Sequence, residues 1–82
     1  MEFEWDSNKE VVNGKKHSVS FHEAATVFGD PDHSVNEHRL ITFGVSRLNR
    51  YIIVAHTDRD DKIRIISARK MLKHERRIYE EG

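Results

Sequence analysis

The chain has 82 residues and no net formal charge; 37% of its residues are hydrophobic and 34% are charged. This length supports one small core, so we expect a single domain over residues 1–82. There is no cysteine, which excludes disulfides and thiolate chemistry, and no apolar run is long enough to span a membrane. The N-terminus also lacks a signal-peptide pattern, and we therefore expect a cytoplasmic protein without membrane contact.

The zero net charge hides an uneven distribution along the chain. Residues 1–38 hold three lysines and eight carboxylates, whereas residues 39–77 hold eleven lysines and arginines and four carboxylates. A basic C-terminal half in a neutral chain favours a localised anionic partner. The plain alternative is that surface charges scatter unevenly in any short sequence.

The first part of the chain predicts two short helices. Residues 2–5 alternate acidic and aromatic side chains, which indicates a very short strand-like lead-in. A capping-box pattern at residues 7–10 predicts a helix that runs towards Lys16. A second capping box at residues 20–23 predicts another helix, which Gly29 ends. The apolar face of this second helix consists of Phe21, Ala24, Ala25 and Phe28.

Three apolar segments follow, and short turns separate them. They cover residues 39–45, 50–57 and 62–68 and are rich in β-branched residues. Short connections between successive strands permit only antiparallel hairpins. We therefore predict an α+β fold with two short N-terminal helices, an antiparallel three- to four-stranded sheet and a C-terminal helix.

The C-terminal helix is predicted to begin at Arg69. Good helix formers dominate from there to Glu81, without Gly or Pro, and Ser67 is suited to the N-cap. The residues expected to face inward are Met71, Leu72, Ile78 and Tyr79.

Arg64 and Arg69 flank this predicted strand-to-helix junction. Guanidinium groups bind phosphate oxygens in pairs, and the N-terminus of a helix attracts anions. Both arginines and the helix N-terminus are therefore expected to face one phosphate. Strand alternation places Arg64 on a face that the helices leave open, with His56 beside it. The alternative for each arginine is an ordinary solvated residue.

Seven segments between Phe3 and Glu80 form an ordered set of motifs. They are Phe3–Glu4–Trp5–Asp6, Lys16–His17, Ser20–Phe21–x–Glu23–Ala24–Ala25–x–Val27–Phe28, Glu37–x–Arg39, His56–Thr57–x–Arg59, Arg64–Ile65–Ile66–Ser67–Ala68–Arg69 and Glu75–Arg76–Arg77–x–Tyr79–Glu80. Together they resemble the BrnT toxins, the ribonuclease halves of BrnT/BrnA type II toxin–antitoxin systems, whose fold is similar to RelE. No single motif is specific, but their order is.

The resemblance implies a small endoribonuclease that cuts RNA without a metal ion or other cofactor and lowers protein synthesis. It also implies a BrnA-like antitoxin partner with a ribbon-helix-helix DNA-binding domain, which neutralises the toxin and with it represses their promoter. A homodimer and a heterotetramer are both open. The alternative function is a catalytically inert module that binds the antitoxin or RNA.

Metal-free RNA cleavage needs a base for the 2′-hydroxyl proton, an acid for the leaving 5′-oxygen and cations for the phosphorane charge. We expect Arg64 and Arg69 to supply charge, with Glu75 orienting Arg69. His17 and His56 are the groups available for proton transfer. The cations expected to contact RNA are Lys16, Arg39, Arg59, Lys70 and Arg76.

Several of these residues have plain structural alternatives. His56 can be a half-buried residue bonded to backbone, and His17 a cation that suits a helix end. Glu37 and Arg39 can form a structural pair. The spacing of the six histidines does not predict a zinc site.

Two departures from the family pattern bear on these expectations. Ser18 stands where the family usually has Gly, so a serine must make a turn that glycine makes at little cost. The segment at residues 30–33 is about one strand shorter than usual. A missing strand there would expose a sheet edge. The antitoxin or a second copy of the chain could cover this edge. An edge that stays uncovered would count against activity.

Overall fold

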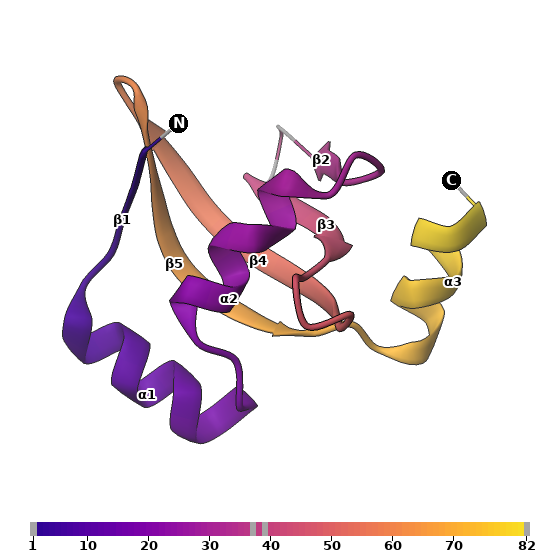
Figure 1. Ribbon diagram of the computed structural model, residues 1–82, viewed down its shortest axis with the longest axis horizontal. Coiled ribbons are helices and arrows are strands. Elements are labelled where there is room, and N and C mark those ends of the chain that lie inside the picture. The colour runs from indigo at the N-terminus through magenta and orange to yellow at the C-terminus, as the bar shows by residue number, and fades with distance from the viewer. Residues whose placement is uncertain (1, 37, 39, 82) are drawn as a thin grey trace.

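The computed structural model describes residues 2–36, 38 and 40–81 and shows the predicted α+β fold (Figure 1). Its elements are β1 (Glu2–Glu4), α1 (Ser7–His17), α2 (Phe21–Thr26), the 3-10 helix η1 (Val27–Gly29), β2 (Ser34–Asn36), β3 (Ile41–Val45), β4 (Tyr51–Arg59), β5 (Lys62–Lys70) and α3 (Lys73–Glu81). Helix α2 lies in front of the sheet in this view, α1 lies at the lower left beside β1 and β5, and α3 lies beyond the other end of the sheet (Figure 1). None of the described helices has the length and apolarity needed to cross a membrane.

Five strands form one sheet in the order β1-β5-β4-β3-β2. The three long strands make the predicted antiparallel meander, and β2 adds to it beside β3. Strand β1 pairs with β5 in parallel, so the predicted lead-in is a true edge strand and the sheet exceeds the predicted three to four strands. The short segment at residues 30–33 leads directly into β2, the outermost strand on that side.

A β-bulge interrupts the pairing of β4 with β5. Between Ala55 and His56 the partner on β5 changes from Ser67 to Ile65, which leaves Ile66 as the extra residue. A residue before the bulge and a residue after it therefore share a face of the sheet when an odd number of positions separates them, whereas a regular strand requires an even number. This shift decides which residues of β5 face the core.

The core lies between α2 and the face of the sheet that carries Ile52 and Val54. Its buried members are Val19, Phe21, Ala24, Val27, Ile52, Val54, Ile65 and Ala68. Burying each of the larger side chains contributes about 1.5–3 kcal/mol. Ala25 and Phe28 pack against this cluster partly buried, so the predicted apolar face of the second helix is confirmed.

Helix α1 begins at Ser7, within the predicted start at Asp6 or Ser7. Asp6 is the N-cap, and its carboxylate accepts hydrogen bonds from two backbone N–H groups of the first turn. Glu10 accepts instead from the backbone N–H of Phe21, 3.1 Å away. At the other end Ser18 adopts the left-handed conformation with φ 58°, so serine does make the turn for which the family uses glycine.

The predicted boundary between the last strand and the last helix is wrong. Strand β5 continues to Lys70 and α3 begins at Lys73, so Ser67 lies within the strand and is not an N-cap. The ladder with β4 extends through Arg69 and Lys70, and this pairing outweighs their helix propensity. Glu75, in the first turn of α3, accepts from the backbone N–H of Leu72 at 2.8 Å and caps the helix there.

Helix α3 is held mainly by polar and aromatic contacts, because none of its described residues is buried. The Tyr79 hydroxyl donates to Asp30 Oδ2 at 2.6 Å, and its ring meets the edge of Tyr51. The predicted inward set is wrong for Leu72 and Ile78, which are 55% and 65% exposed. The helix leaves the end of the sheet and does not cover its face, which is why these residues have no core to enter.

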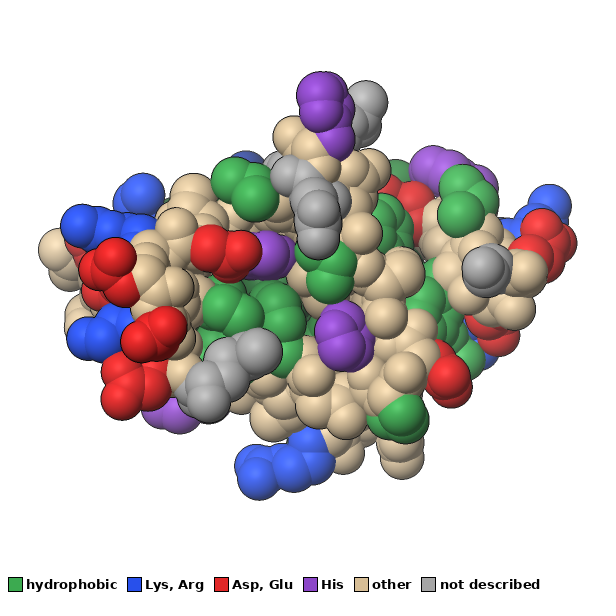
Figure 2. All heavy atoms as spheres, turned by 90° about the horizontal axis from the view of Figure 1, so that it is seen from above, with side chains coloured by type: hydrophobic (Ala, Val, Ile, Leu, Met, Phe, Trp, Pro, Cys, Tyr) green, Lys and Arg blue, Asp and Glu red, His purple; other side chains and the backbone are tan. Residues whose placement is uncertain are grey.

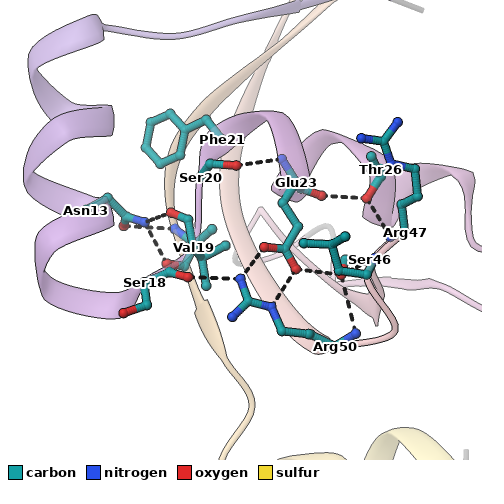
Figure 3. A network of polar contacts seen from close by, with 12 residues as sticks. Asn13, Ser18, Val19, Ser20, Phe21, Glu23, Thr26, Ser46, Arg47 and Arg50 are labelled. Carbon is teal, nitrogen blue, oxygen red and sulfur yellow. Dashed lines mark hydrogen bonds and ion pairs between the residues drawn. The ribbon is translucent and has the colours of Figure 1, made fainter.

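A buried polar network joins α2 to the loop between β3 and β4 (Figure 3). The Glu23 carboxylate, on a residue that is 7% exposed, accepts hydrogen bonds from the Arg50 guanidinium and from Ser46 Oγ. Arg50 also donates to the backbone carbonyl of Ser18 at 2.9 Å. The bond from Arg50 lowers the pKa of Glu23 against the opposing effect of burial, and the bond from Ser46 lowers it further. The carboxylate therefore stays ionised.

We expect Glu23→Gln to destabilise the fold, because it leaves the Arg50 guanidinium without its counter-charge. Removing one partner of a buried pair costs about 3–5 kcal/mol, and the partial exposure of Arg50 reduces this to about 2–3 kcal/mol. Since the pKa of Glu23 is lowered in the folded chain, its stabilisation is present above the ordinary glutamate pKa. It is lost as the pH falls through the lowered value.

Urea unfolding of the wild type and of Glu23→Gln, from neutral pH down through the lowered pKa of Glu23, tests the expectation. The difference in unfolding free energy between wild type and Glu23→Gln should narrow only under acidic conditions. Glu2→Gln is the control, because its carboxylate is 71% exposed and lies 4.0 Å from Lys62. A difference that does not change with pH would contradict the assignment.

Gly44 marks the closest approach of the sheet to the layer above it. A Cβ at this position would lie 2.8 Å from Val27 Cγ1 and 3.0 Å from the Cβ of His33. We expect Gly44→Ala to lower the unfolding free energy by about 1–3 kcal/mol. Gly14→Ala, which meets nothing within 4 Å in α1, should raise it by about 0.5–1 kcal/mol. If Gly44→Ala and Gly14→Ala change the unfolding free energy equally in denaturant unfolding, a glycine is not sterically required at position 44.

Candidate active site

Arg64 and Arg69 lie on the same face of β5, opposite the core. Arg64 pairs with Thr57 and Arg69 with Ile53, and directly paired residues of an antiparallel ladder point to the same side. The bulge at Ile66 makes this possible, because residues five positions apart in a regular strand point to opposite sides. Helix α2 packs on the other face (Figure 1).

The predicted arrangement of both guanidinium groups around one phosphate at a helix N-terminus is wrong. Both arginines lie inside β5, and the spacing of their partners puts their Cα atoms about 13 Å apart. Each faces its own carboxylate. Arg64 is 3.4 Å from Glu4 of β1, with both side chains about one-third exposed, whereas Arg69 binds Glu75 of α3.

The Arg69–Glu75 pair is the stronger of the two. The two terminal nitrogens of Arg69 donate to the two carboxylate oxygens of Glu75 at 2.8 and 2.9 Å. This bond lowers the pKa of Glu75 to about 2, against the effect of burial and with help from the Leu72 N–H. Arg69 keeps 38% of its side chain exposed. Its guanidinium is thus held in one orientation while it still reaches solvent.

A groove runs between α1 and β5. Its described lining residues are Asn8, Lys9, Val12, Asn13, Lys16, His17, Ile66 and Ser67. After the bulge, Ser67 and Arg69 alternate onto the same face. Lys16 and His17, at the end of α1, therefore share the groove with Ser67, and Arg69 is the next residue of β5 on the face of Ser67.

A buried amide fixes this groove. Asn13 Nδ2 donates to the carbonyl of Ala68 at 2.9 Å, and Asn13 Oδ1 accepts from the N–H of Ala68 at 3.1 Å. The side chain thus bonds the outer edge of β5 as a neighbouring strand would. It also donates to the carbonyl of Val19 at 3.0 Å, which ties the segment after α1 to the same point.

His56 does not line this groove; it is 3% exposed and faces the core. Its Nε2 is 2.8 Å from Thr42 Oγ1, and its Nδ1 lies 3.5 Å from Asp58 Oδ1 without a hydrogen bond. Burial lowers the pKa of His56, and Asp58 opposes this only in part. The prediction that His56 lies beside Arg64 is wrong, since the register pairs it with Ile65.

Comparison with known proteins now identifies the family. The family model for the ribonuclease toxin, BrnT, of type II toxin–antitoxin systems matches residues 5–75. The chain belongs to the BrnT family. A 1.1 Å crystal structure of the Brucella abortus ribonuclease toxin BrnT is similar to it, with a TM-score of 0.70 and 22% identity over 89% of this chain and 99% of that one. A search of curated proteins finds no match.

The family assignment confirms the resemblance in the sequence, and the structural match confirms the fold. The chain is a BrnT-family ribonuclease toxin of a type II toxin–antitoxin system. RNA as the substrate and an antitoxin as the partner follow from membership of that family. At 22% identity, the likeness to the Brucella toxin supports the fold alone.

Two cations predicted to contact RNA in this BrnT-family chain lie far from each other. Arg59 ends β4 at the hairpin turn, and Lys70 ends β5 about 23 Å away along the ladder. At the hairpin end Arg59 and Lys62 share the surface with four acids, and positive and negative side chains are mixed there (Figure 2). Only Lys70 is near the BrnT candidate site along the strand.

Arg76, another predicted RNA contact, also lies outside the groove. The Arg76 guanidinium stacks 3.9 Å over the Tyr51 ring, and its Nε lies 3.6 Å from Glu80. Arg39, and the predicted Glu37–Arg39 pair with it, fall outside the described residues. Among the residues the structure describes, no group of three or more His, Asp or Glu is placed to hold a metal ion.

Sequence reasoning missed the contributions of Asn13 and Ser67 to this BrnT site. Ser67 was predicted to be the N-cap of the last helix and not a residue of the site. Asn13 is polar and follows two valines in a helix with few apolar residues, and that pattern gives no sign that its amide is buried at 6% exposure.

We expect the Arg69–Glu75 pair to show strong coupling in a double-mutant cycle with Arg69→Ala and Glu75→Gln. Two-bond geometry and the low exposure of Glu75 favour a coupling of about 1–2 kcal/mol in unfolding free energy. The exposed Arg76–Glu80 pair is the matched control and should couple by less than about 0.5 kcal/mol. Because the pKa of Glu75 is lowered to about 2, the coupling should persist well below the ordinary glutamate pKa and vanish only near pH 2. Equal coupling energies in the two cycles would contradict the assignment of Arg69–Glu75 as the stronger pair.

Proposed function

We propose that this chain is an endoribonuclease that cuts RNA without a metal ion, with its site where the α1–β5 groove meets Arg69. One observation carries the proposal. Lys16 and His17 of α1 and Ser67 of β5 line one groove, and Arg69 follows on the face of Ser67. No carboxylate is among the described residues that line the groove. This cluster offers cations and an imidazole to a phosphodiester.

The reaction assigned to this cluster is attack of the RNA 2′-oxygen on the adjacent phosphorus. His17 accepts the 2′-hydroxyl proton as the P–O2′ bond forms. The P–O5′ bond breaks, and the leaving 5′-oxygen takes a proton from Lys16 or water. Arg69, oriented by Glu75, and Lys16 stabilise the phosphorane charge. The products are a 2′,3′-cyclic phosphate and a 5′-hydroxyl.

Arg64 takes a different part in this proposal from the one expected from the sequence. It lies about 13 Å along the face from Arg69, too far to grip the same phosphate in its present pairing. We assign it to a phosphate further along the RNA strand. Its contact with Glu4 is long and exposed, so a phosphate can displace that carboxylate at little cost. His56 is left out because it is sealed in the core.

The biological setting follows the family. We propose a cytoplasmic toxin that lowers protein synthesis by cutting RNA and that a BrnA-like ribbon-helix-helix antitoxin neutralises. The membership of the chain in a family of type II toxins supports an antitoxin partner, and the groove's cations support an RNA substrate.

An RNA cleavage assay in the presence of EDTA tests the nuclease. We expect the purified chain to cut single-stranded RNA. His17→Ala and Arg69→Ala should each lower the rate about 10²-fold, because they remove proton transfer and charge stabilisation. Arg64→Ala should have a smaller effect, about tenfold, because it contacts a distant phosphate. Initial rates on an end-labelled RNA provide the measurement.

Arg47→Ala is the matched control for these variants. Arg47 is exposed in the loop between β3 and β4, and its backbone N–H makes the contact to Thr26. Its loss should leave cleavage unchanged. If wild type cuts no better than the Arg64→Ala, Arg69→Ala double variant, the catalytic assignment fails.

A second candidate function, binding without cleavage, has one observation in its favour. Both Arg64 and Arg69 already face carboxylates, so part of the positive charge is neutralised within the chain. In the same assay this alternative gives RNA retention without products. Retention that falls with rising salt and an absence of cyclic phosphate would favour it.

A further inference from the structure

The groove between α1 and β5 exposes two aliphatic side chains that RNA cleavage does not use. Val12 is 63% exposed and Ile66 is 37% exposed, and both line the groove. Ile66 is the extra residue of the bulge, so the break in register leaves it without a direct partner on β4. Neither side chain helps to bind a phosphate. An exposed aliphatic pair in a groove instead favours contact with a protein.

The charge of the groove restricts what kind of protein fits. Lys9, Lys16 and His17 surround the aliphatic pair, and its described lining residues include no acid. Glu10 on the same helix is turned away, where it accepts from the N–H of Phe21 and lies 3.4 Å from His22 Nδ1. A partner that matches this surface carries aliphatic and acidic side chains together.

The backbone edge of β5 restricts the partner further. Strand β1 pairs with residues 62–64, and the Asn13 amide takes both the N–H and the C=O of Ala68. An added strand therefore cannot pair with this edge at Ala68. A helix lying in the groove needs no backbone partner and presents aliphatic side chains every three or four residues.

We propose that this groove binds an acidic amphipathic helix of the antitoxin. Its aliphatic side chains contact Val12 and Ile66, and its carboxylates pair with Lys9 and Lys16. The bound helix covers Lys16 and His17 and so excludes RNA. The identity of the partner and the inhibition rest on the proposed function, whereas the docking chemistry does not.

Binding of synthetic peptides to the intact chain tests this docking. The probe is a helical peptide of about 20 residues with leucine at every third or fourth position and glutamate elsewhere. A matched peptide has lysine in place of each glutamate. We expect the acidic peptide to bind and the basic peptide not to bind. The acidic peptide should also slow RNA cleavage in proportion to its occupancy.

Two neighbouring valines of α1 supply matched variants. Val11 is 56% exposed and lies outside the groove lining, whereas Val12 lines the groove. Val12→Asn should weaken binding of the acidic peptide about fivefold to tenfold, and Val11→Asn should leave it unchanged. Both variants replace valine by asparagine in the same helix, so the change in helix propensity is the same. Circular dichroism checks that both variants fold. Ile66→Thr repeats the test from β5 and should weaken binding to a similar degree.

The outcomes separate this inference from the nuclease proposal. Equal effects of Val11→Asn and Val12→Asn, or equal binding of both peptides, would overturn the docking site. Loss of affinity for a single-stranded RNA oligonucleotide in Val12→Asn, without loss for the acidic peptide, would make the groove an RNA site instead. If the wild type does not cut RNA but shows the expected peptide pattern, the nuclease proposal fails and the docking site stands.

Discussion

The buried pair of Glu23 and Arg50 is the interaction on which the position of the groove between α1 and β5 depends (Figure 3). It links α2 to the start of β4, and through Arg50 it also binds the carbonyl of Ser18, directly after α1. In an 82-residue chain the core alone supplies little surplus stability, so a buried network that joins three segments has a large share in fixing their arrangement. Lys16 and His17 lie just before Ser18, and the network therefore orients the part of α1 that carries the candidate chemistry.

The bulge in β5 is the second constraint, and it acts on the other wall of the groove. It places Arg64 and Arg69 on one face, and it presents Ile66 to solvent where a regular strand would have a paired residue. Asn13 then closes the edge of β5 by bonding Ala68. The two proposed roles of the groove, binding of phosphate and binding of a protein, thus depend on the same bulge.

Local sequence signals predicted the elements well and their register poorly. The cap at Ser20 and the spacing of the apolar residues after it were sufficient for α2, because these interactions are formed within a few residues. The end of β5 was not predictable in this way, since the pairing of Arg69 with Ile53 depends on a strand far back in the chain. The same holds for Arg64, because the bulge decides on which face it lies relative to His56. Spacing therefore predicted which cations exist, but not which of them meet.

The carboxylates that face the two arginines determine how each one can serve the reaction. Glu75 engages Arg69 through two short bonds, so the pair as a whole adds little net charge and the guanidinium is held in a fixed direction. The lysines that line the groove are Lys9 and Lys16. Arg64 has one long contact to Glu4, which a phosphate can replace. In our proposals, an anion pairs with these lysines and meets a guanidinium that Glu75 already holds in place. A partner with both acidic and aliphatic side chains pairs with the same lysines and also contacts Val12 and Ile66, which a phosphodiester leaves unused.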